Sequence, residues 1–142
     1  MCSANFIKIY DLKNDTKHII EVQDATLYTD KFGLKSEHGL FGTDDWWEAI
    51  KQGAIKKISV EGVISRIFMS GHNDFPEFEV VSKNGRTIWH RLGDNKYYAL
   101  GKRAKIVYVN QEFKKPVPGL TVAKIPLEIY IEDSHNHETR HR

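Results

Sequence analysis

The segment "GHNDF" holds His72 and Asp74, a pair of side chains that could act in acid–base chemistry. An imidazole and a carboxylate two residues apart can pass a proton to and from a bound substrate. The sequence places no third group beside them, and loops rich in Gly, Asn and Asp are usually turns. It also lacks a Walker loop, a G-x-S-x-G elbow and a C-x-x-C pair. We therefore predict no catalytic residue, and a protein that is not an enzyme.

A second group of reactive side chains lies near the C-terminus. His135, His137 and His141 have the spacing H-x-H-x3-H, which can chelate zinc or nickel weakly. A structural site would need an ordered fourth ligand, and the segment "SHNHETRHR" is polar throughout. We expect residues 134–142 to form a disordered tail, and we predict no metal and no cofactor.

The third group is a set of cations and aromatic rings in one stretch of the chain. Residues 83–115 carry nine Lys/Arg and two Asp/Glu, a net charge of +7 in a chain whose net charge is +2. Rings among cations can stack bases while the cations hold phosphates, or the cations can meet an acidic protein surface. The candidate residues for binding a protein or nucleic acid are Lys83, Arg86, Trp89, Arg91, Lys96, Tyr97, Tyr98, Lys102, Arg103 and Lys105.

A hairpin positions the first half of this set. The runs "FEVVS" and "RTIWHRL" flank Asn84-Gly85, the preferred dipeptide of a tight type I′ turn. Alternate side chains of a strand face opposite sides, so either Trp89 faces the core or Ile88, His90 and Leu92 do. The alternative to a binding face is that one of these sets packs inward and the remaining charges form an ordinary solvated surface.

Three further runs read as strands. In "KKISVEGVISRIFM" the apolar parity changes near Gly62, which predicts a bend or bulge where a glycine makes it least costly. "KRAKIVYVNQEF" is a strand, and "KKPVPGL" is expected to be a proline-containing loop. "VAKIPLEIYIED" alternates cleanly, with Ala123, Ile125, Leu127, Ile129 and Ile131 on one side.

This order of a long bent strand, a hairpin and two more strands resembles the OB-fold barrel over residues 57–133. The resemblance is carried by "VEGVISRIF", "FEVVSKNGRTIWHRL" and "LGKRAKIVYV". It implies a five-stranded barrel whose second and third strands form part of the ligand-binding face. The connection "GDNKYYALG" is too short for the helix that OB barrels often carry there, so an SH3-like barrel or a small β-sandwich stays open.

A short helix precedes the barrel and contains two of the three tryptophans. Thr43 is the expected N-cap, Asp44 and Asp45 suit the first turn, and Gly53 ends the helix. Trp46 lies on one face with Ile50, and the adjacent Trp47 points about 100° away. We expect Trp46 to plug the core, so that Trp46→Ala unfolds or loosens the domain, while a change at Trp89 mainly affects binding. An exposed partner site at the tryptophans is the alternative.

The N-terminal part is expected to be a β extension of the same domain. "NFIKIYDL" and "HIIEVQ" are predicted as strands joined by the turn "KNDTK", and "ATLYTDKFGLKSEHG" as a further hairpin turning at Gly33. The predicted fold is mainly β with one short helix: a single domain over residues 1–133, made of the extension (1–42), the helix (43–53) and an OB-like barrel (57–133).

Composition sets the expected environment. The single cysteine, Cys2, excludes an internal disulfide framework, and the N-terminus lacks the pattern of a secretory signal. No apolar run approaches the roughly 20 residues that span a bilayer. We expect a cytoplasmic protein with no membrane contact.

"GTDDWWEAI" followed by "DFPEFEV" also resembles a group of small uncharacterised bacterial proteins, which implies a bacterial origin and a shared fold. Two functions remain. The first is a non-catalytic module of immunity or regulatory type that binds a protein partner through the basic face. The second is an OB-type protein that binds single-stranded nucleic acid. The modest net charge favours the first.

Overall fold

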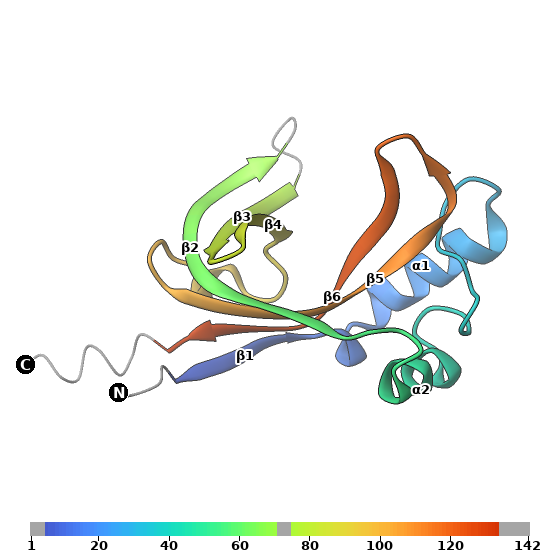
Figure 1. Cartoon of the computed structure of the whole chain (residues 1–142), viewed down its shortest axis with the longest axis horizontal. Coiled ribbons are helices and arrows are strands. Elements are labelled where there is room, and N and C mark those ends of the chain that lie inside the picture. The colour runs from blue at the N-terminus through green and yellow to red at the C-terminus, as the bar shows by residue number, and fades with distance from the viewer. Residues whose placement is uncertain (1–4, 71–74, 134–142) are drawn as a thin grey trace, which may run out of the picture. The chain divides into compact units, whose positions relative to one another are not determined.

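The computed structural model describes residues 5–70 and 75–133, and β-strands dominate it (Figure 1). The strands are β1 (Phe6–Asp11), β2 (Ile58–Ser70), β3 (Phe75–Ser82), β4 (Gly85–His90), β5 (Arg103–Val117) and β6 (Leu120–Glu132). They form one antiparallel sheet in the order β1-β6-β5-β2-β3-β4. The prediction of a mainly β protein is confirmed. Strands β1 and β4 are therefore the two edges of the sheet. The OB-like barrel topology stays a prediction.

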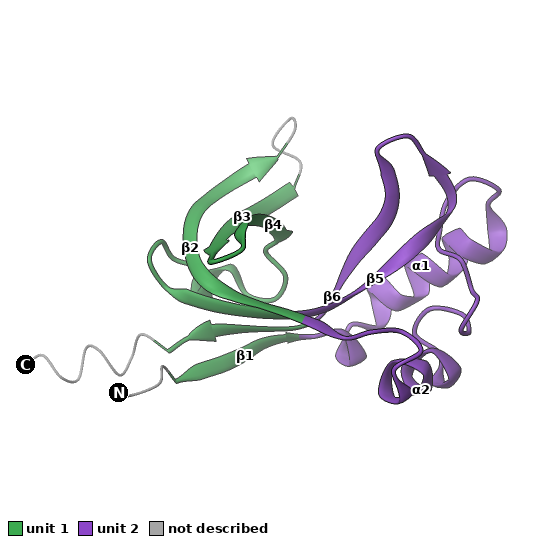
Figure 2. Cartoon of the chain, in the orientation of Figure 1, with its two compact units in different colours: residues 1–10, 59–106, 128–142 green, residues 11–58, 107–127 purple. Residues whose placement is uncertain are grey.

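The chain forms two compact units, each assembled from segments far apart in the sequence (Figure 2). Unit 1 comprises residues 1–10, 59–106 and 128–142, and unit 2 comprises residues 11–58 and 107–127. The long strands β5 and β6 contribute to both units. The candidates His72, Asp74, His135, His137 and His141, and the predicted tail, lie outside the described residues.

Each unit has its own core of buried apolar side chains. Those of unit 1 are Tyr10, Ile64, Phe78, Val80, Trp89, Tyr98, Ala104, Ile106, Ile129 and Ile131. Those of unit 2 are Leu12, Leu34, Phe41, Trp46, Ile50, Ile55, Val109, Ile125 and Leu127. The alternation predicted for the last strand is confirmed, because four of the five residues on its apolar side are buried and Ala123 is half-buried.

The prediction of a strand at "HIIEVQ" is wrong, because this segment belongs to helix α1 (Thr16–Tyr28). The Asp15 carboxylate accepts from the backbone N–H of His18 at 3.4 Å and caps the helix. Ile19, Val22 and Thr26 follow at helical spacing and are partly buried. The β-branched residues of this segment favour a strand, but the Asp15 cap and the partly buried face of Ile19, Val22 and Thr26 stabilise a helix instead.

The predicted hairpin at "ATLYTDKFGLKSEHG" is also wrong. Its first residues continue α1, and the chain then returns along β5, where Leu34 forms an isolated bridge with Phe113. Gly33 does turn the chain, as predicted, with φ of 100°. A Cβ at this position would lie 2.4 Å from the Cα of Thr26, so only glycine fits.

Helix α2 (Asp44–Gln52) matches the predicted helix closely. Thr43 is the N-cap residue, but its hydroxyl donates to the carbonyl of Leu40 at 2.7 Å instead of capping a helix amide. Trp46 and Ile50 are buried, and Gly53 ends the helix in the left-handed region with φ of 88°. Trp46 is therefore the predicted core plug, here in the core of unit 2.

Packing and one hydrogen bond hold Trp46 in place. Its ring lies 4.7 Å from that of Phe41 between centroids, and its indole N–H donates to Oε1 of Gln111 at 2.7 Å. Trp47 meets it edge-on at 4.9 Å, is only half-buried, and has the ammonium of Lys13 5.1 Å from its ring. The two tryptophans thus differ in burial as the helix geometry predicts.

Two predicted connections differ in detail. The hairpin at Asn84-Gly85 is confirmed, but Ser82 pairs with Gly85, so the two turn residues are Lys83 and Asn84. The expected proline loop "KKPVPGL" is mostly strand, because β5 continues through Val117 and the chain turns at Pro118-Gly119.

Replacing Trp46 with alanine should destabilise the protein by about 3–5 kcal/mol, because a fully buried ring is lost and the amide of Gln111 loses its donor. Trp47→Ala is the matched control and should cost about 1 kcal/mol. Urea unfolding followed by circular dichroism measures both. Equal losses for the two variants would contradict the assignment of Trp46 as the core residue.

Candidate partner-binding surface

A bulge in β2 determines which side chains of unit 1 face outward. Ile64 pairs with Val80 and Arg66 pairs with Glu79, so Ser65 is an extra residue in β2. The parity change was predicted near Gly62, and the bulge lies three residues later. Gly62 instead allows the backbones of β2 and β3 to approach closely, because a Cβ at this position would lie 2.2 Å from the carbonyl oxygen of Val81.

The register arranges the outward side chains of β2, β3 and β4 in cross-strand rows. The rows are Val63–Val81–Arg86, Arg66–Glu79–Ile88 and Phe68–Glu77–His90, and Phe75 extends the same side of β3. The opposite side carries the buried Phe78, Val80 and Trp89. We call the outward side, made of these three rows with Ser65 and Phe75, the arginine face.

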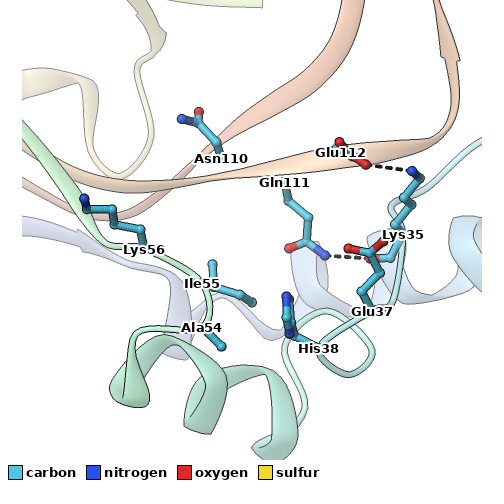
Figure 3. Close-up of a pocket in the computed structure, with 9 residues that line it drawn as sticks. All are labelled: Lys35, Glu37, His38, Ala54, Ile55, Lys56, Asn110, Gln111 and Glu112. Carbon is cyan, nitrogen blue, oxygen red and sulfur yellow. Dashed lines mark hydrogen bonds and ion pairs between the residues drawn. The ribbon is translucent and has the colours of Figure 1, made fainter.

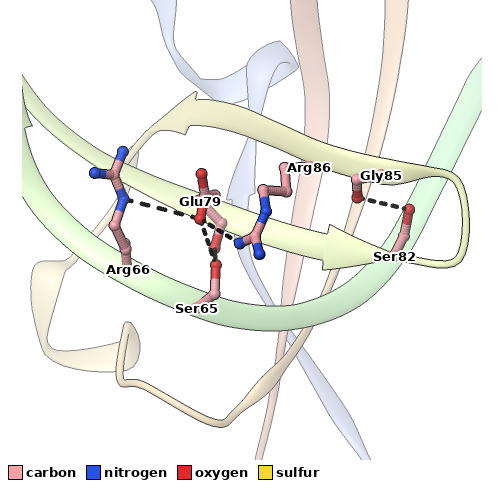
Figure 4. A network of polar contacts seen from close by, with 6 residues as sticks. All are labelled: Ser65, Arg66, Glu79, Ser82, Gly85 and Arg86. Atoms are coloured by element: carbon pink, nitrogen blue, oxygen red, sulfur yellow. Dashed lines mark hydrogen bonds and ion pairs between the residues drawn. The ribbon is translucent and has the colours of Figure 1, made fainter.

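Glu79 lies at the centre of the arginine face, where its side chain is only 10% exposed (Figure 4). Oε1 of Glu79 accepts from the hydroxyl of Ser65 at 2.8 Å and from Nη1 of Arg86 at 3.2 Å. Nε of Arg66 lies 3.8 Å from the same oxygen. A covered carboxylate needs such donors, and the bulge supplies one of them by turning Ser65 toward Glu79.

These donors also set the ionisation of Glu79. The hydrogen bond from Ser65 lowers the pKa of Glu79 most; burial opposes the change, and Arg66 and Arg86 lower it further. The carboxylate is therefore ionised at neutral pH, and both guanidinium groups have a fixed negative partner.

The rest of the arginine face combines rings with charges. The guanidinium of Arg66 lies 4.2 Å from the ring centroid of Phe68, a cation–π distance. His90 meets the ring of Phe75 edge-on at 5.7 Å, and Nδ1 of His90 lies 3.7 Å from a carboxylate oxygen of Glu77.

Two of the predicted binding residues are buried in unit 1 and leave the candidate set. Trp89 lies in the inward row with Phe78, and its indole N–H donates to the hydroxyl of Thr87 at 2.8 Å. Tyr98 packs 4.7 Å from Phe78, its hydroxyl donates to the carbonyl of Leu92 at 2.6 Å, and burial raises the pKa of Tyr98. Neither ring can stack on a partner here, and Trp89→Ala is expected to affect stability.

The strand parity thus resolves the alternative left open by the sequence. Trp89 faces the core, and Ile88 and His90 face outward.

The other predicted residues are spread over unit 1, and several contact their own fold. Arg86 lies on the arginine face, and Lys83 is exposed in the adjoining turn. Arg91 donates to the carbonyl of Phe68 at 3.1 Å, and Arg103 pairs with Glu61 at 3.1 Å.

The last predicted residues lie on the connection before β5 and on β5 itself. The ammonium of Lys96 lies 5.2 Å from the ring of Tyr97, and that of Lys102 donates to the carbonyl of Tyr97 at 3.5 Å. Lys105 lies 5.7 Å from the ring of Tyr130. The structure therefore brings only Arg86 of the predicted set into the Glu79 cluster. Sequence reasoning missed Ser65, Arg66 and Glu79, whose only signal was the parity change in β2.

Unit 2 contains a cavity of about 230 Å³ between the loop at residues 35–38, the segment 54–56 and residues 110–112 of β5 (Figure 3). Lys35 pairs with Glu112 at 2.6 Å, and this hydrogen bond raises the pKa of Lys35. Gln111, which accepts from Trp46, donates to the carbonyl of Lys35 at 2.6 Å. These contacts join the loop to β5 and support the Trp46 site.

Unit 2 also exposes large apolar side chains. They are Ile20, Leu27, Tyr28 and Phe32 on and after α1, and Val117, Leu120 and Val122 at the β5–β6 turn. A contiguous patch of such side chains would mark a contact surface, whereas single ones are normal on a protein surface.

The structure is thus a mainly β protein whose strands β2, β3 and β4 expose charged and apolar side chains on one side of the sheet. A family model described as immunity protein RhsI2 matches residues 7–132. The chain therefore belongs to the RhsI2 immunity protein family, and this membership indicates a protein-binding function directed at a toxin.

Immunity proteins are typically non-catalytic. A comparison with curated proteins found no match. Within residues 5–70 and 75–133, no helix is long and apolar enough to cross a membrane.

Ser65→Ala should raise the pKa of Glu79 toward its ordinary value of 4.5, because the donor that lowers it most is lost while burial remains. A depressed pKa stabilises the fold above the ordinary value, and this contribution is lost as pH falls through the folded value. As the pH falls, the variant should therefore lose this stabilising contribution of Glu79 at a higher pH than the wild-type protein. A carbon NMR titration of the Glu79 carboxyl measures the change.

Ser82→Ala is the matched control, because the Ser82 hydroxyl donates to the carbonyl of Gly85 at 3.4 Å (Figure 4) and accepts from the backbone N–H of Asn84 at 3.2 Å, within the β3–β4 hairpin. An unchanged pKa of Glu79 in Ser65→Ala would contradict the role given to this hydroxyl.

Proposed function

We propose that this chain neutralises one cognate toxin by binding it, without chemical modification of the toxin. The family match over residues 7–132 is the observation that carries the proposal. The proposed location is the cytoplasm of the bacterium that makes the toxin, in keeping with a single cysteine.

The basic residues of unit 1 are the proposed means of recognition. Of the residues predicted from the sequence, seven basic residues and one ring are retained: Lys83, Arg86, Arg91, Lys96, Lys102, Arg103 and Lys105, with Tyr97. Cations near an interface accelerate the encounter with an acidic surface and fix its orientation. Several of these cations are held by partners of their own fold, which lowers the entropy lost on binding.

Single-stranded nucleic acid is the weaker candidate partner. Binding of that kind needs rings on which bases can stack, and Trp89 and Tyr98 are buried. Tyr97 is the one ring of the predicted set that is partly exposed.

Co-expression with a candidate toxin domain, chosen from the genes that neighbour this one in its native genome, tests the proposal. We expect growth to be restored, and the purified proteins to form a complex with a Kd below about 1 µM. The toxin recovered from the complex under denaturing conditions should have an unchanged mass, because binding alone blocks it.

Loss of growth and absence of a complex would contradict the proposal. A toxin whose mass is altered by the chain would show catalysis instead. Binding of labelled single-stranded DNA or RNA that weakens steeply with salt, without toxin binding, would favour the nucleic-acid alternative.

A further inference from the structure

The arginine face presents cations outward and covers its carboxylates. The side chains of Arg66 and Arg86 are 55% and 66% exposed, whereas those of Glu77 and Glu79 are 17% and 10% exposed. A partner approaching this face therefore meets positive charge first, although the face carries both signs.

We infer that the arginine face is the surface that binds the toxin, that Arg66 and Arg86 contact carboxylates of an acidic patch on it, and that Glu79 is the residue that positions both arginines. The inference deepens the proposed function and rests on it.

The geometry of the cluster leaves both arginines able to bind. A guanidinium has five N–H donors, and Oε1 of Glu79 engages one nitrogen of each arginine, Nη1 of Arg86 and Nε of Arg66. The remaining donors of the two groups can meet carboxylates in the paired geometry that arginine favours. Because both groups are already restrained, less side-chain entropy is lost on binding.

Apolar side chains complete this surface. Phe68 lies under the guanidinium of Arg66, and Val63, Phe75 and Ile88 are exposed on the same face. Arginine and aromatic residues are the types that contribute most often to binding energy at the centre of an interface. The arginine face therefore combines charge for orientation with apolar area for affinity.

The charge distribution favours an acidic protein over other occupants of this face. A nucleic acid would also meet the cations, but Trp89 is buried on the inward side. The outward rings of Phe68 and His90 lie in one row with Glu77, whose carboxylate repels phosphates. The apolar side chains of α1 in unit 2 are the competing protein contact, and the experiment below separates the two surfaces.

The first test compares two double variants that remove the same charge. Arg66→Ala with Arg86→Ala should weaken the Kd for the neighbouring toxin domain by about 30-fold or more, measured by calorimetry at low and moderate salt. Lys17→Ala with Lys31→Ala removes two exposed cations from unit 2 and should change the Kd less than about threefold. Thermal unfolding confirms that each variant is folded.

The second test isolates the positioning role of Glu79. Glu79→Gln keeps the size of the side chain and removes its charge, and it should weaken binding by about fivefold to tenfold in the wild-type background. In the background lacking both arginines it should have almost no effect. A purely structural role of Glu79 would give the same loss in both backgrounds.

The outcomes separate this inference from the proposed function. A wild-type chain that does not bind the toxin overturns both. Wild-type binding that survives the loss of Arg66 and Arg86 overturns only the inference, as does binding lost in Leu27→Ala with Tyr28→Ala on α1 but kept in the arginine variant. Arginine-dependent binding to single-stranded nucleic acid with no toxin binding would also overturn it.

Discussion

Glu79 is an acidic residue on the outward side of β3, yet its side chain is almost covered, and this constraint organises the surface around it. A carboxylate that has lost most of its water must find donors nearby, and Ser65, Arg66 and Arg86 provide them. Two cations that would otherwise repel each other are held together by one anion. The result is a pair of guanidinium groups on an exposed β-surface that share one carboxylate.

The bulge at Ser65 links this cluster to the core on the other side of the sheet. Without the extra residue, Ile64 and Ile67 could not both oppose inward side chains of β3, Val80 and Phe78. The same insertion brings the Ser65 hydroxyl to Glu79. One local irregularity therefore serves the packing of unit 1 and the electrostatics of its outer face. Unit 2 depends on a different contact, in which Trp46 fills the core and binds Gln111.

Local patterns in the sequence predicted several elements well. The end of α2 at Gly53, the burial of Trp46 and the hairpin that contains Asn84 depend on neighbouring residues, which the sequence shows directly. The sequence does not predict helix α1, because "HIIEVQ" has strand propensity and the capping residue Asp15 lies in a polar segment typical of a turn. The Glu79 cluster could not be predicted, because it depends on the pairing of β2 with β3 and on the exact position of the bulge. Membership of the RhsI2 immunity protein family then supplied the class of partner.

Hydrogen–deuterium exchange with and without the toxin domain would locate the contact surface most directly, because it follows every part of the chain in one experiment. We expect bound toxin to slow exchange in β2, β3 and β4, around residues 63–70 and 75–90, and to leave α1 unchanged. Slowed exchange confined to α1 and the β5–β6 turn, with no change in β2–β4, would contradict this expectation.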